Sequence, residues 1–295
     1  MSARATRLLP DVVTRSFGDI TIHVVNTGFV QVKAQHRRLR GPISLRMLSI
    51  VLDREWTEWM PVLVAIVVHP EGVFLVDAGM SEETLTTGTT ACDAITARVY
   101  RHLLRFDFSP ERRIDRQLHA LDIAPERIAG IVLTHRHADH ADALAHLPAS
   151  AEVYVGQGDW PSHAGALPCR WPSARTPVLV GAAGEAMGCF PNTHALTHDG
   201  RVRVVPMPGH SPGHLGLMAR TEGHDVVCAG DATFSHQDLF AQRLAGIVER
   251  PTEAAATLRT LRSHVEAHPT QVLLCHDSQA LERFARGEMT QPDVA

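Results

Sequence analysis

The stretch LTHRHADHADAL, residues 133–144, places three histidines and an aspartate within six positions. The apolar run that leads into it, IAGIVLTH (128–135), predicts a buried strand, and residues 139–147 predict a helix behind it. The polar cluster therefore occupies a junction between a strand and a helix, which is where α/β proteins place functional groups.

The spacing within HRHADH indicates a metal site. Alternate side chains of an extended segment point the same way, so His135 and His137 can reach one point from the end of the strand. Asp139 and His140 follow after the chain turns and can reach a second point nearby. Imidazole and carboxylate are suitable ligands for zinc and similar divalent ions.

Three further ligand candidates occupy equivalent places later in the chain. Each is a polar residue at the end of an apolar strand-like run: His210, Asp231 and His276. Glycines flank the first of them and let the backbone approach a site closely. His214 is a rival to His210, although its position at the opening of the next strand favours a structural role.

Strands and helices alternate along the whole chain, which predicts an α/β architecture. With 295 residues, of which 44% are hydrophobic, the chain can bury a sizeable core. The predicted strands are 20–26, 62–69, 73–79, 128–135, 152–156, 201–207, 214–220, 225–231 and 271–277. The predicted helices are 91–106, 110–121, 139–147, 251–268 and 278–287.

Two stretches, about 28–60 and 157–200, show no clear periodicity and contain the four tryptophans. Long irregular segments in a compact domain are usually functional or disordered. We interpret both as walls of a substrate pocket, with Trp56 and Trp59 as candidate contacts, because apolar and aromatic surface lines most ligand sites. A solvated loop or a subunit contact, giving a possible homodimer, is the alternative for the first stretch.

Composition excludes several classes of function. The net charge of −4 gives no field that favours nucleic acid, and no apolar run approaches the roughly 18 residues of a membrane span. The N-terminus lacks the apolar region of a signal peptide. The five cysteines are widely spaced and form no CxxC pair, which predicts a reducing, cytoplasmic environment without disulfides.

Together these residues resemble the metallo-β-lactamase superfamily over roughly residues 20–280. HRHADH matches the HxHxDH motif, the three later candidates follow in the family's order, and LVDAGM (75–80) matches a strand-end segment that precedes the motif. The resemblance implies an αββα sandwich, with residues 1–295 as a single hydrolase domain, and a site for two divalent ions. It assigns the ligands as follows: His135, His137 and His210 to the first ion, Asp139, His140 and His276 to the second, and Asp231 as the bridge, with Asp77 orienting a ligand histidine.

Within the superfamily, the chain is most similar to N-acyl-homoserine lactone lactonases. The matching segments are PGHSPGH (208–214), GDATF (230–234) and CHD (275–277). One residue departs from the pattern, because Phe234 stands where these lactonases usually carry a tyrosine whose hydroxyl contacts the substrate carbonyl. Ser235 or His236 could substitute for the missing hydroxyl.

The resemblance implies hydrolysis of a small lactone or ester by a hydroxide that bridges two metal ions, most simply zinc, with iron, manganese or cobalt also compatible. Asp139 could carry the proton to the alkoxide that ring opening creates. Thioesterases, phosphotriesterases and other lactonases share such a site and stay open as alternatives, whereas zinc β-lactamases do not use an aspartate at the bridging position. A metal-retaining signalling or binding protein with little turnover is a further alternative, which Phe234 keeps open.

Overall fold

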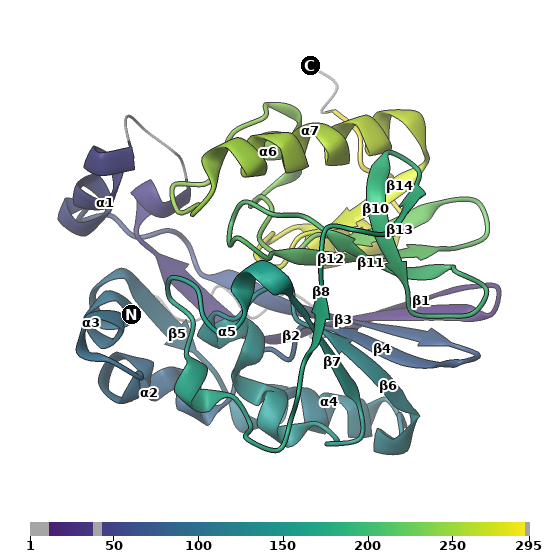
Figure 1. Cartoon of the computed structure of the whole chain (residues 1–295), viewed down its shortest axis with the longest axis horizontal. Helices are drawn as coiled ribbons and strands as arrows, with labels where there is room; N and C mark the ends of the chain where they lie inside the picture. The colour runs from purple at the N-terminus through teal and green to yellow at the C-terminus, as the bar shows by residue number, and fades with distance from the viewer. Residues whose placement is uncertain (1–11, 38–42, 293–295) are drawn as a thin grey trace.

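Two β-sheets packed face to face, with helices on both outer faces, make up the computed structural model of the chain (Figure 1). The structure describes residues 12–37 and 43–292. This arrangement confirms the αββα sandwich expected from the sequence. The N-terminal residues on which the expectation about a signal peptide rests lie outside the described residues.

Within the described residues, the first sheet has eight strands and comes mainly from the N-terminal half of the chain. Seven strands follow one another across the sheet and the eighth, β5, pairs with the far end of β2. In spatial order they are β1 Val12–Phe17, β2 Ile20–Val32, β3 Met60–His69, β4 Gly72–Val76, β6 Ile128–Val132, β7 Glu152–Gly156 and β8 Val178–Val180, with β5 Leu104–Asp107.

The second sheet has six strands in the described part of the chain and comes from the C-terminal half. Its strands pair antiparallel except for β13 and β14, which run parallel. In spatial order they are β14 Thr270–Leu273, β13 Asp225–Cys228, β12 Leu215–Arg220, β11 Val202–Pro206, β10 Phe190–Ala195 and β9 Glu185–Met187.

Helices α2, α3 and α4 lie on the outer side of the first sheet, and α6 and α7 lie on the outer side of the second (Figure 1). The helices are α1 Ile43–Leu52, α2 Glu82–Thr90, α3 Ala94–Leu103, α4 Ile114–Ala120, α5 Ala138–Ala141, α6 His236–Phe240, α7 Pro251–Ala267 and α8 Ala280–Arg286. None of the helices within the described ranges combines the length and apolar character needed to span a bilayer.

The central strands are apolar on both faces because each sheet is covered on both sides. In β4, Phe74 and Val76 point into the core between the sheets, whereas Val73 and Leu75 point toward the helical layer that contains α4. This double burial explains why the strand reads as a continuous apolar run in the sequence.

The structure differs from the sequence prediction in several stretches, and two of them show the physical reason. The helix predicted at 91–106 ends at Leu103, and the next residues form β5, which pairs with β2. Residues 157–200, expected to be irregular, contain the three short strands β8, β9 and β10. Strand pairing decides both cases, because β5 pairs with β2 and β8 with β7, whereas β9 and β10 form a hairpin that joins β11. Local periodicity does not show such pairing.

The prediction of a chain without disulfides is wrong, because the structure joins Cys92 and Cys169. The two cysteines are 77 residues apart in sequence, so their spacing gave no sign of a pair. Disulfides persist in oxidising environments, and the cysteine pattern therefore gives no support to a reducing compartment. Cys228 and Cys275 are buried and free.

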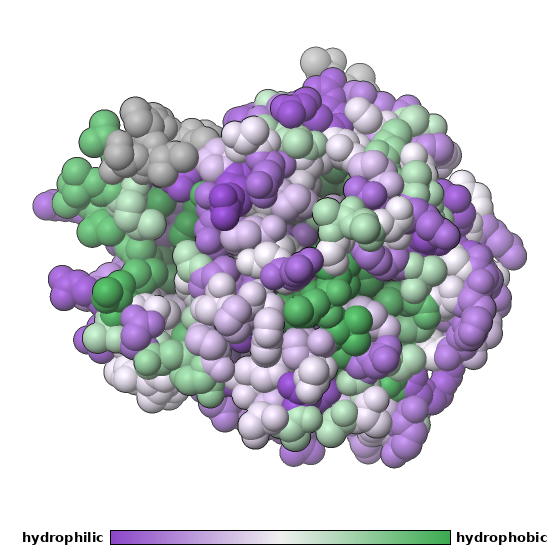
Figure 2. Space-filling model, viewed as in Figure 1, coloured by the Kyte–Doolittle hydropathy of each residue, from purple (hydrophilic) through white to green (hydrophobic). Residues whose placement is uncertain are grey.

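Helix α1 carries a strongly apolar surface. Figure 2 shows hydrophobic atoms gathered at the left edge of the molecule, the side on which α1 and α3 lie. The large apolar side chains of α1 that are more than about two-fifths exposed are Leu45, Met47, Leu48, Val51 and Leu52. The first irregular stretch of the sequence therefore contains an apolar helix, a surface suited to the subunit contact considered above.

Candidate metal centre

The predicted ligands meet at one edge of the sandwich because they all follow the carboxyl ends of strands. His135 to His140 follow β6 in the first sheet, and His210, Asp231 and His276 follow β11, β13 and β14 in the second. Since the two sheets face each other, loops from both converge at this edge. All seven side chains are buried or nearly so.

Three imidazoles converge on one point. His135 Nε2 lies 2.8 Å from His137 Nδ1, and His210 Nε2 lies 3.2 Å from the first nitrogen and 3.3 Å from the second. Nitrogens bound to one tetrahedral zinc at about 2.0–2.1 Å are separated by roughly 3.3 Å. The three nitrogens are therefore spaced as ligands of a single ion.

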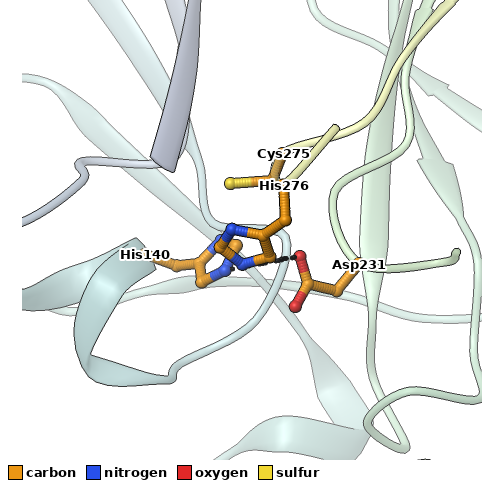
Figure 3. Close-up of side chains that lie close together, drawn as sticks. All are labelled: His140, Asp231, Cys275 and His276. Atoms are coloured by element: carbon orange, nitrogen blue, oxygen red, sulfur yellow. Dashed lines mark ion pairs between the residues drawn. The ribbon is translucent and has the colours of Figure 1, made fainter. Parts of the chain in front are cut away.

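A second cluster lies beside the first and includes two histidines and two carboxylates. His276 Nε2 lies 3.4 Å from Asp231 Oδ1 and 3.5 Å from Asp139 Oδ2, and His140 Nε2 lies 3.5 Å from the same Asp231 oxygen. Figure 3 shows both rings directed toward the Asp231 carboxylate, while the Cys275 sulfur points away from it. Two buried atoms here, His140 Nε2 and Asp231 Oδ1, have no hydrogen-bond partner, which is how groups that await a cation behave.

Asp231 faces both clusters with different oxygens. Its Oδ1 is directed at His140 and His276, whereas its Oδ2 lies 3.7 Å from His210 Nε2 in the first cluster. One carboxylate between two groups of nitrogen donors has the geometry of a bridging ligand. The donor set therefore fits two divalent ions rather than one.

Asp77 holds His140 in the orientation that the second cluster requires. Its Oδ2 accepts a hydrogen bond from His140 Nδ1 at 2.8 Å, which leaves Nε2 free to face the carboxylates. Thr134 donates to Asp77 from both its backbone nitrogen and its hydroxyl, at 2.7 and 3.0 Å. A carboxylate behind a histidine in this way fixes the tautomer and raises the basicity of the ligand.

The charges of the two clusters differ. Burial lowers the pKa of His137 to about 4 and holds that of His210 well below its usual range. Both rings are therefore neutral and can bind a metal ion through a nitrogen lone pair. Burial also opposes the charge on His276, but the Asp231 carboxylate raises the pKa of this ring to about 10. A cation at the second cluster therefore competes with a proton on His276.

Two buried residues brace the metal-ligand loops, and the sequence had indicated a structural role for only one of them, His214. The rival candidate His214 lies behind the site, where its Nε2 accepts the backbone N–H of Asp231 at 3.2 Å. Asp159, which is fully buried, accepts hydrogen bonds from Ser211 Oγ at 2.7 Å and from the Gly213 backbone at 2.6 Å. Both bonds tie it to the loop that carries His210. The PGHSPGH match could have suggested a braced loop, but no sequence signal pointed to Asp159.

The segment around Asp159 also contacts the HRHADH loop. His137 donates from Nε2 to the carbonyl of Ala164 at 3.0 Å, which directs its Nδ1 toward the first cluster. The Arg136 backbone N–H donates to His163 Nε2 at 3.1 Å. The second irregular stretch of the sequence therefore supports the predicted ligands of the first ion.

Phe234 lies against the second cluster. Its ring stacks on His276 with the ring centres 5.9 Å apart, and it is buried. The proposed substitutes for the missing hydroxyl are engaged elsewhere, because Ser235 donates to Asp238 at 2.7 Å and His236 Nε2 lies 2.9 Å from the Val272 carbonyl.

A cavity of about 280 Å³ opens beside His276 and Phe234. Apart from Phe234, its lining is polar and includes Arg37, Glu58 and Gln237. Trp56 has other contacts, since it lies between the Lys33 ammonium and the Arg105 guanidinium, 4.0 and 3.9 Å from its ring centre. Whether Trp56 and Trp59 contact an acyl chain stays a prediction.

The sequence pattern of the Metallo-beta-lactamase superfamily matches residues 57–276, a range that includes all seven predicted ligands. The chain belongs to this superfamily. As a metallo-β-lactamase-fold protein it is 24% identical over 237 residues to the N-acyl homoserine lactonase AttM of Agrobacterium fabrum strain C58, and the match covers 77% of this chain and 86% of the relative.

Solved structures show the same fold for this superfamily member. One is an N-acyl homoserine lactone hydrolase with its product N-hexanoyl-L-homoserine bound at the catalytic metal centre, with a TM-score of 0.69, 18% identity and coverage of 91% of this chain and 94% of that one. Another is AidC, described as a dizinc quorum-quenching lactonase, with a TM-score of 0.60, 15% identity and 91% coverage of both chains.

Proposed function

We propose that this metallo-β-lactamase-fold protein is a dinuclear metal-dependent hydrolase that opens the lactone ring of N-acyl-homoserine lactones. The observation that carries the proposal is the position of Asp231, with one oxygen facing His210 and the other facing His140 and His276. A site that holds two ions side by side is suited to ester hydrolysis. The lactonase relatives support the choice of ester.

We propose the ligand assignment given by the family resemblance. His135, His137 and His210 hold the first ion, and Asp139, His140 and His276 hold the second, with Asp231 between them. Zinc is the proposed metal, because nitrogen and carboxylate donors at tetrahedral spacing suit it, and AidC is described as a dizinc enzyme. When bound, the two ions supply a water of lowered pKa as the nucleophile and polarise the ester carbonyl as Lewis acids.

The chain's own residues complete the reaction by positioning groups and moving a proton. Asp77 keeps His140 in one tautomer, and His214 holds the backbone of Asp231 in place. Asp139 is buried beside His276 and is the carboxylate we propose to carry a proton to the alkoxide that leaves when the ring opens. Phe234 covers the ring of His276 and contributes no hydroxyl.

The polar cavity beside His276 suits the lactone ring and amide of the substrate better than its alkyl chain. The substrate is a small molecule, with no nucleic acid or membrane partner in the proposal. A homodimer stays a prediction, and the exposed face of α1 is the surface on which sedimentation analysis of a Leu48→Glu variant can test it. The cytoplasmic localisation also stays a prediction.

A pH-stat assay tests the function directly. Purified protein is given a panel of acyl-homoserine lactones, thioesters and phosphotriesters, and acid release is followed with and without a chelator. We expect chelator-sensitive release from the lactones. Release from thioesters or phosphotriesters alone would replace the lactonase by another hydrolase of the same fold. The absence of turnover on every substrate by protein with both ions bound would favour a binding protein.

A further inference from the structure

A third group of metal-binding side chains lies far from the candidate metal centre. Cys189 lies in the turn between β9 and β10, His264 in the last turn of α7, and His268 directly after that helix. His264 faces Asp225, where β13 begins, whereas the predicted bridging residue Asp231 follows the other end of this strand. The group therefore belongs to the opposite end of the second sheet.

The three side chains are close enough to bind one ion. One ligand atom from each, the Cys189 thiol and a ring nitrogen of both histidines, lies within 4.8 Å of the other two. Ligands at about 2.0–2.3 Å from a tetrahedral zinc are separated by roughly 3.3–3.7 Å. Closing the group around an ion thus needs a shift of at most about 1 Å, which rotation of the half-buried Cys189 and His268 side chains can supply.

A carboxylate behind His264 gives the group a second feature of metal sites. His264 is fully buried, and its Nε2 lies 3.2 Å from Asp225 Oδ2. Burial opposes the charge on Asp225, yet His264 and Arg220 lower the pKa of this carboxyl to about 2. The carboxylate lies beside Nε2, so Nδ1 is the ring nitrogen that faces the turn carrying Cys189, and this placement is similar to carboxylate–histidine–zinc arrangements.

The turn that carries Cys189 is shaped to reach this ring. Gly188 has a φ of 58°, and a Cβ at this position would lie 2.5 Å from His264 Nδ1, so a larger residue would push the turn away. In the structure, the Cys189 backbone N–H donates to Nδ1 at 3.3 Å. This long hydrogen bond would compete with a metal ion, because both would use the same lone pair on His264 Nδ1.

We propose that Cys189, His264 and His268 form a third metal site, for a zinc-like divalent ion, with the fourth position taken by water. The thiolate and two imidazoles are donors that zinc prefers, and the half-buried cysteine and His268 leave a route for the ion and for water. Held between the β9–β10 turn and the end of α7, the ion is structural.

Cobalt substitution tests the proposal with a signal that the catalytic centre does not give. The purified protein is exchanged into Co²⁺, and the thiolate-to-cobalt charge-transfer band in the near ultraviolet is recorded during titration. We expect the band because this site supplies a thiolate, whereas the proposed catalytic ligands are histidines and aspartates only. Elemental analysis of the zinc form should give three ions per chain.

Matched variants show which cysteine gives rise to the thiolate-to-cobalt band. Cys189→Ser should abolish it and lower the zinc content from three ions to two, with lactone hydrolysis within about twofold of the wild type. Cys275→Ser is the control for the cysteine next to the catalytic cluster, and there the band should persist. His268→Gln should also remove the third ion and serves if Cys189→Ser does not fold.

Two results would overturn the proposal. One is the absence of a thiolate band together with two ions in both the wild type and Cys189→Ser. The other is a band that disappears in Cys275→Ser and persists in Cys189→Ser. In either case His264 would be a structural histidine that fixes the β9–β10 turn. Because the readouts are absorption and metal content, they are independent of whether the catalytic centre is a lactonase.

Discussion

Asp77, which orients a predicted ligand histidine, has an unfavourable backbone conformation. Its φ of 68° lies in the left-handed region, which costs a residue other than glycine about 1–2 kcal/mol. Hydrogen bonds to both carboxylate oxygens, from Thr134 and His140, offset this cost. The residue was recognisable in the sequence from LVDAGM, but Thr134, which serves both Asp77 and His135, was not.

The position of Asp231 predicts the result of removing its charge. Asp231→Asn keeps the shape of the side chain but leaves two groups of imidazoles without the shared anion. We expect the metal content to fall from about two catalytic ions to one or fewer after dialysis, with activity reduced at least a hundredfold, because a bridging ligand serves both ions. Elemental analysis and lactone assays measure the two effects.

The exposed Asp107→Asn is the matched control and should retain its ions. An Asp231→Asn protein with unchanged metal content would contradict the bridging role.

Adding one hydroxyl group at position 234 should raise the rate of lactone hydrolysis. The ring stacks on His276, so Phe234→Tyr adds a hydroxyl at the edge of the cavity with little change in volume. A hydrogen bond aimed at the developing charge can contribute about 2.7–4 kcal/mol, and even part of this should raise kcat on acyl-homoserine lactones several-fold. Steady-state kinetics and metal analysis check the variant. If it keeps both ions and is slower on every lactone, the carbonyl binds elsewhere and the comparison with lactonases fails at this position.

At the scale of elements, the segment 159–171 braces the first cluster rather than only lining a pocket. It contacts the HRHADH loop through Ala164 and the His210 loop through Asp159. Its far end is fixed by the disulfide at Cys169 and by Arg170, whose guanidinium lies 2.6 Å from Asp142. The segment therefore connects the metal loops to the region of α2 and α3.

This bracing predicts an effect on metal affinity from a residue that touches no metal ligand. Asp159→Asn keeps an oxygen for the Gly213 N–H and offers an amide donor to Ser211 Oγ, but it removes the negative charge, so both bonds to the His210 loop should lose the strength that the carboxylate gives them. We expect zinc affinity at the first cluster to fall roughly 10–100-fold, the range found for groups behind metal ligands. Competition with a chromophoric chelator measures it, and Asp115→Asn serves as the control. Unchanged affinity in a folded Asp159→Asn protein would show that the segment does not set the site.

Elements with a clear apolar pattern could be predicted from the sequence, and elements defined by distant pairing could not. The strand before HRHADH and the 251–268 helix were recognisable because each has a clear apolar pattern, and the structure places β6 at Ile128–Val132 and α7 at Pro251–Ala267. By contrast, Leu104–Asp107 continues the helical periodicity of α3 but pairs with β2, because the edge of that strand offers unsatisfied backbone groups.

At the scale of the whole molecule, the buried His36 makes the free energy of unfolding depend on pH. Burial lowers the pKa of His36 to about 4, against an ordinary value near 6.5 in the unfolded chain. The folded protein therefore holds this ring neutral, and its contribution is fully present above about pH 6.5 and is lost as the pH falls toward 4. At pH 5 the loss amounts to about 2 kcal/mol.

A His36→Gln variant tests this coupling because glutamine does not titrate. We expect the free energy of unfolding of the wild type to drop by about 2 kcal/mol more than that of the variant between pH 7.5 and pH 5, measured in urea at constant metal concentration. Equal drops in the two proteins would show that His36 does not control the acid response.

Most of the candidate site could be predicted from the sequence because its residues follow strands whose apolar runs are unmistakable. His210, Asp231 and His276 are distant in sequence, yet each ends such a run, and parallel placement of strand ends brings them together. The bracing residues Asp159 and His163 and the Cys92–Cys169 pair carry no local signal. Their roles arise only when loops from separate parts of the chain pack against one another.

The division of the predicted ligands between the two sheets has a consequence for biosynthesis. While the ribosome has delivered only the first sheet, the nascent chain offers the HRHADH cluster and none of the donors that follow β11, β13 and β14. A full set of donors exists only after His276, near the C-terminus, has emerged and the second sheet has docked. Under the proposed ligand assignment, both ions could be bound only late in maturation, and the metal content would then report that both halves of the chain have been completed and assembled.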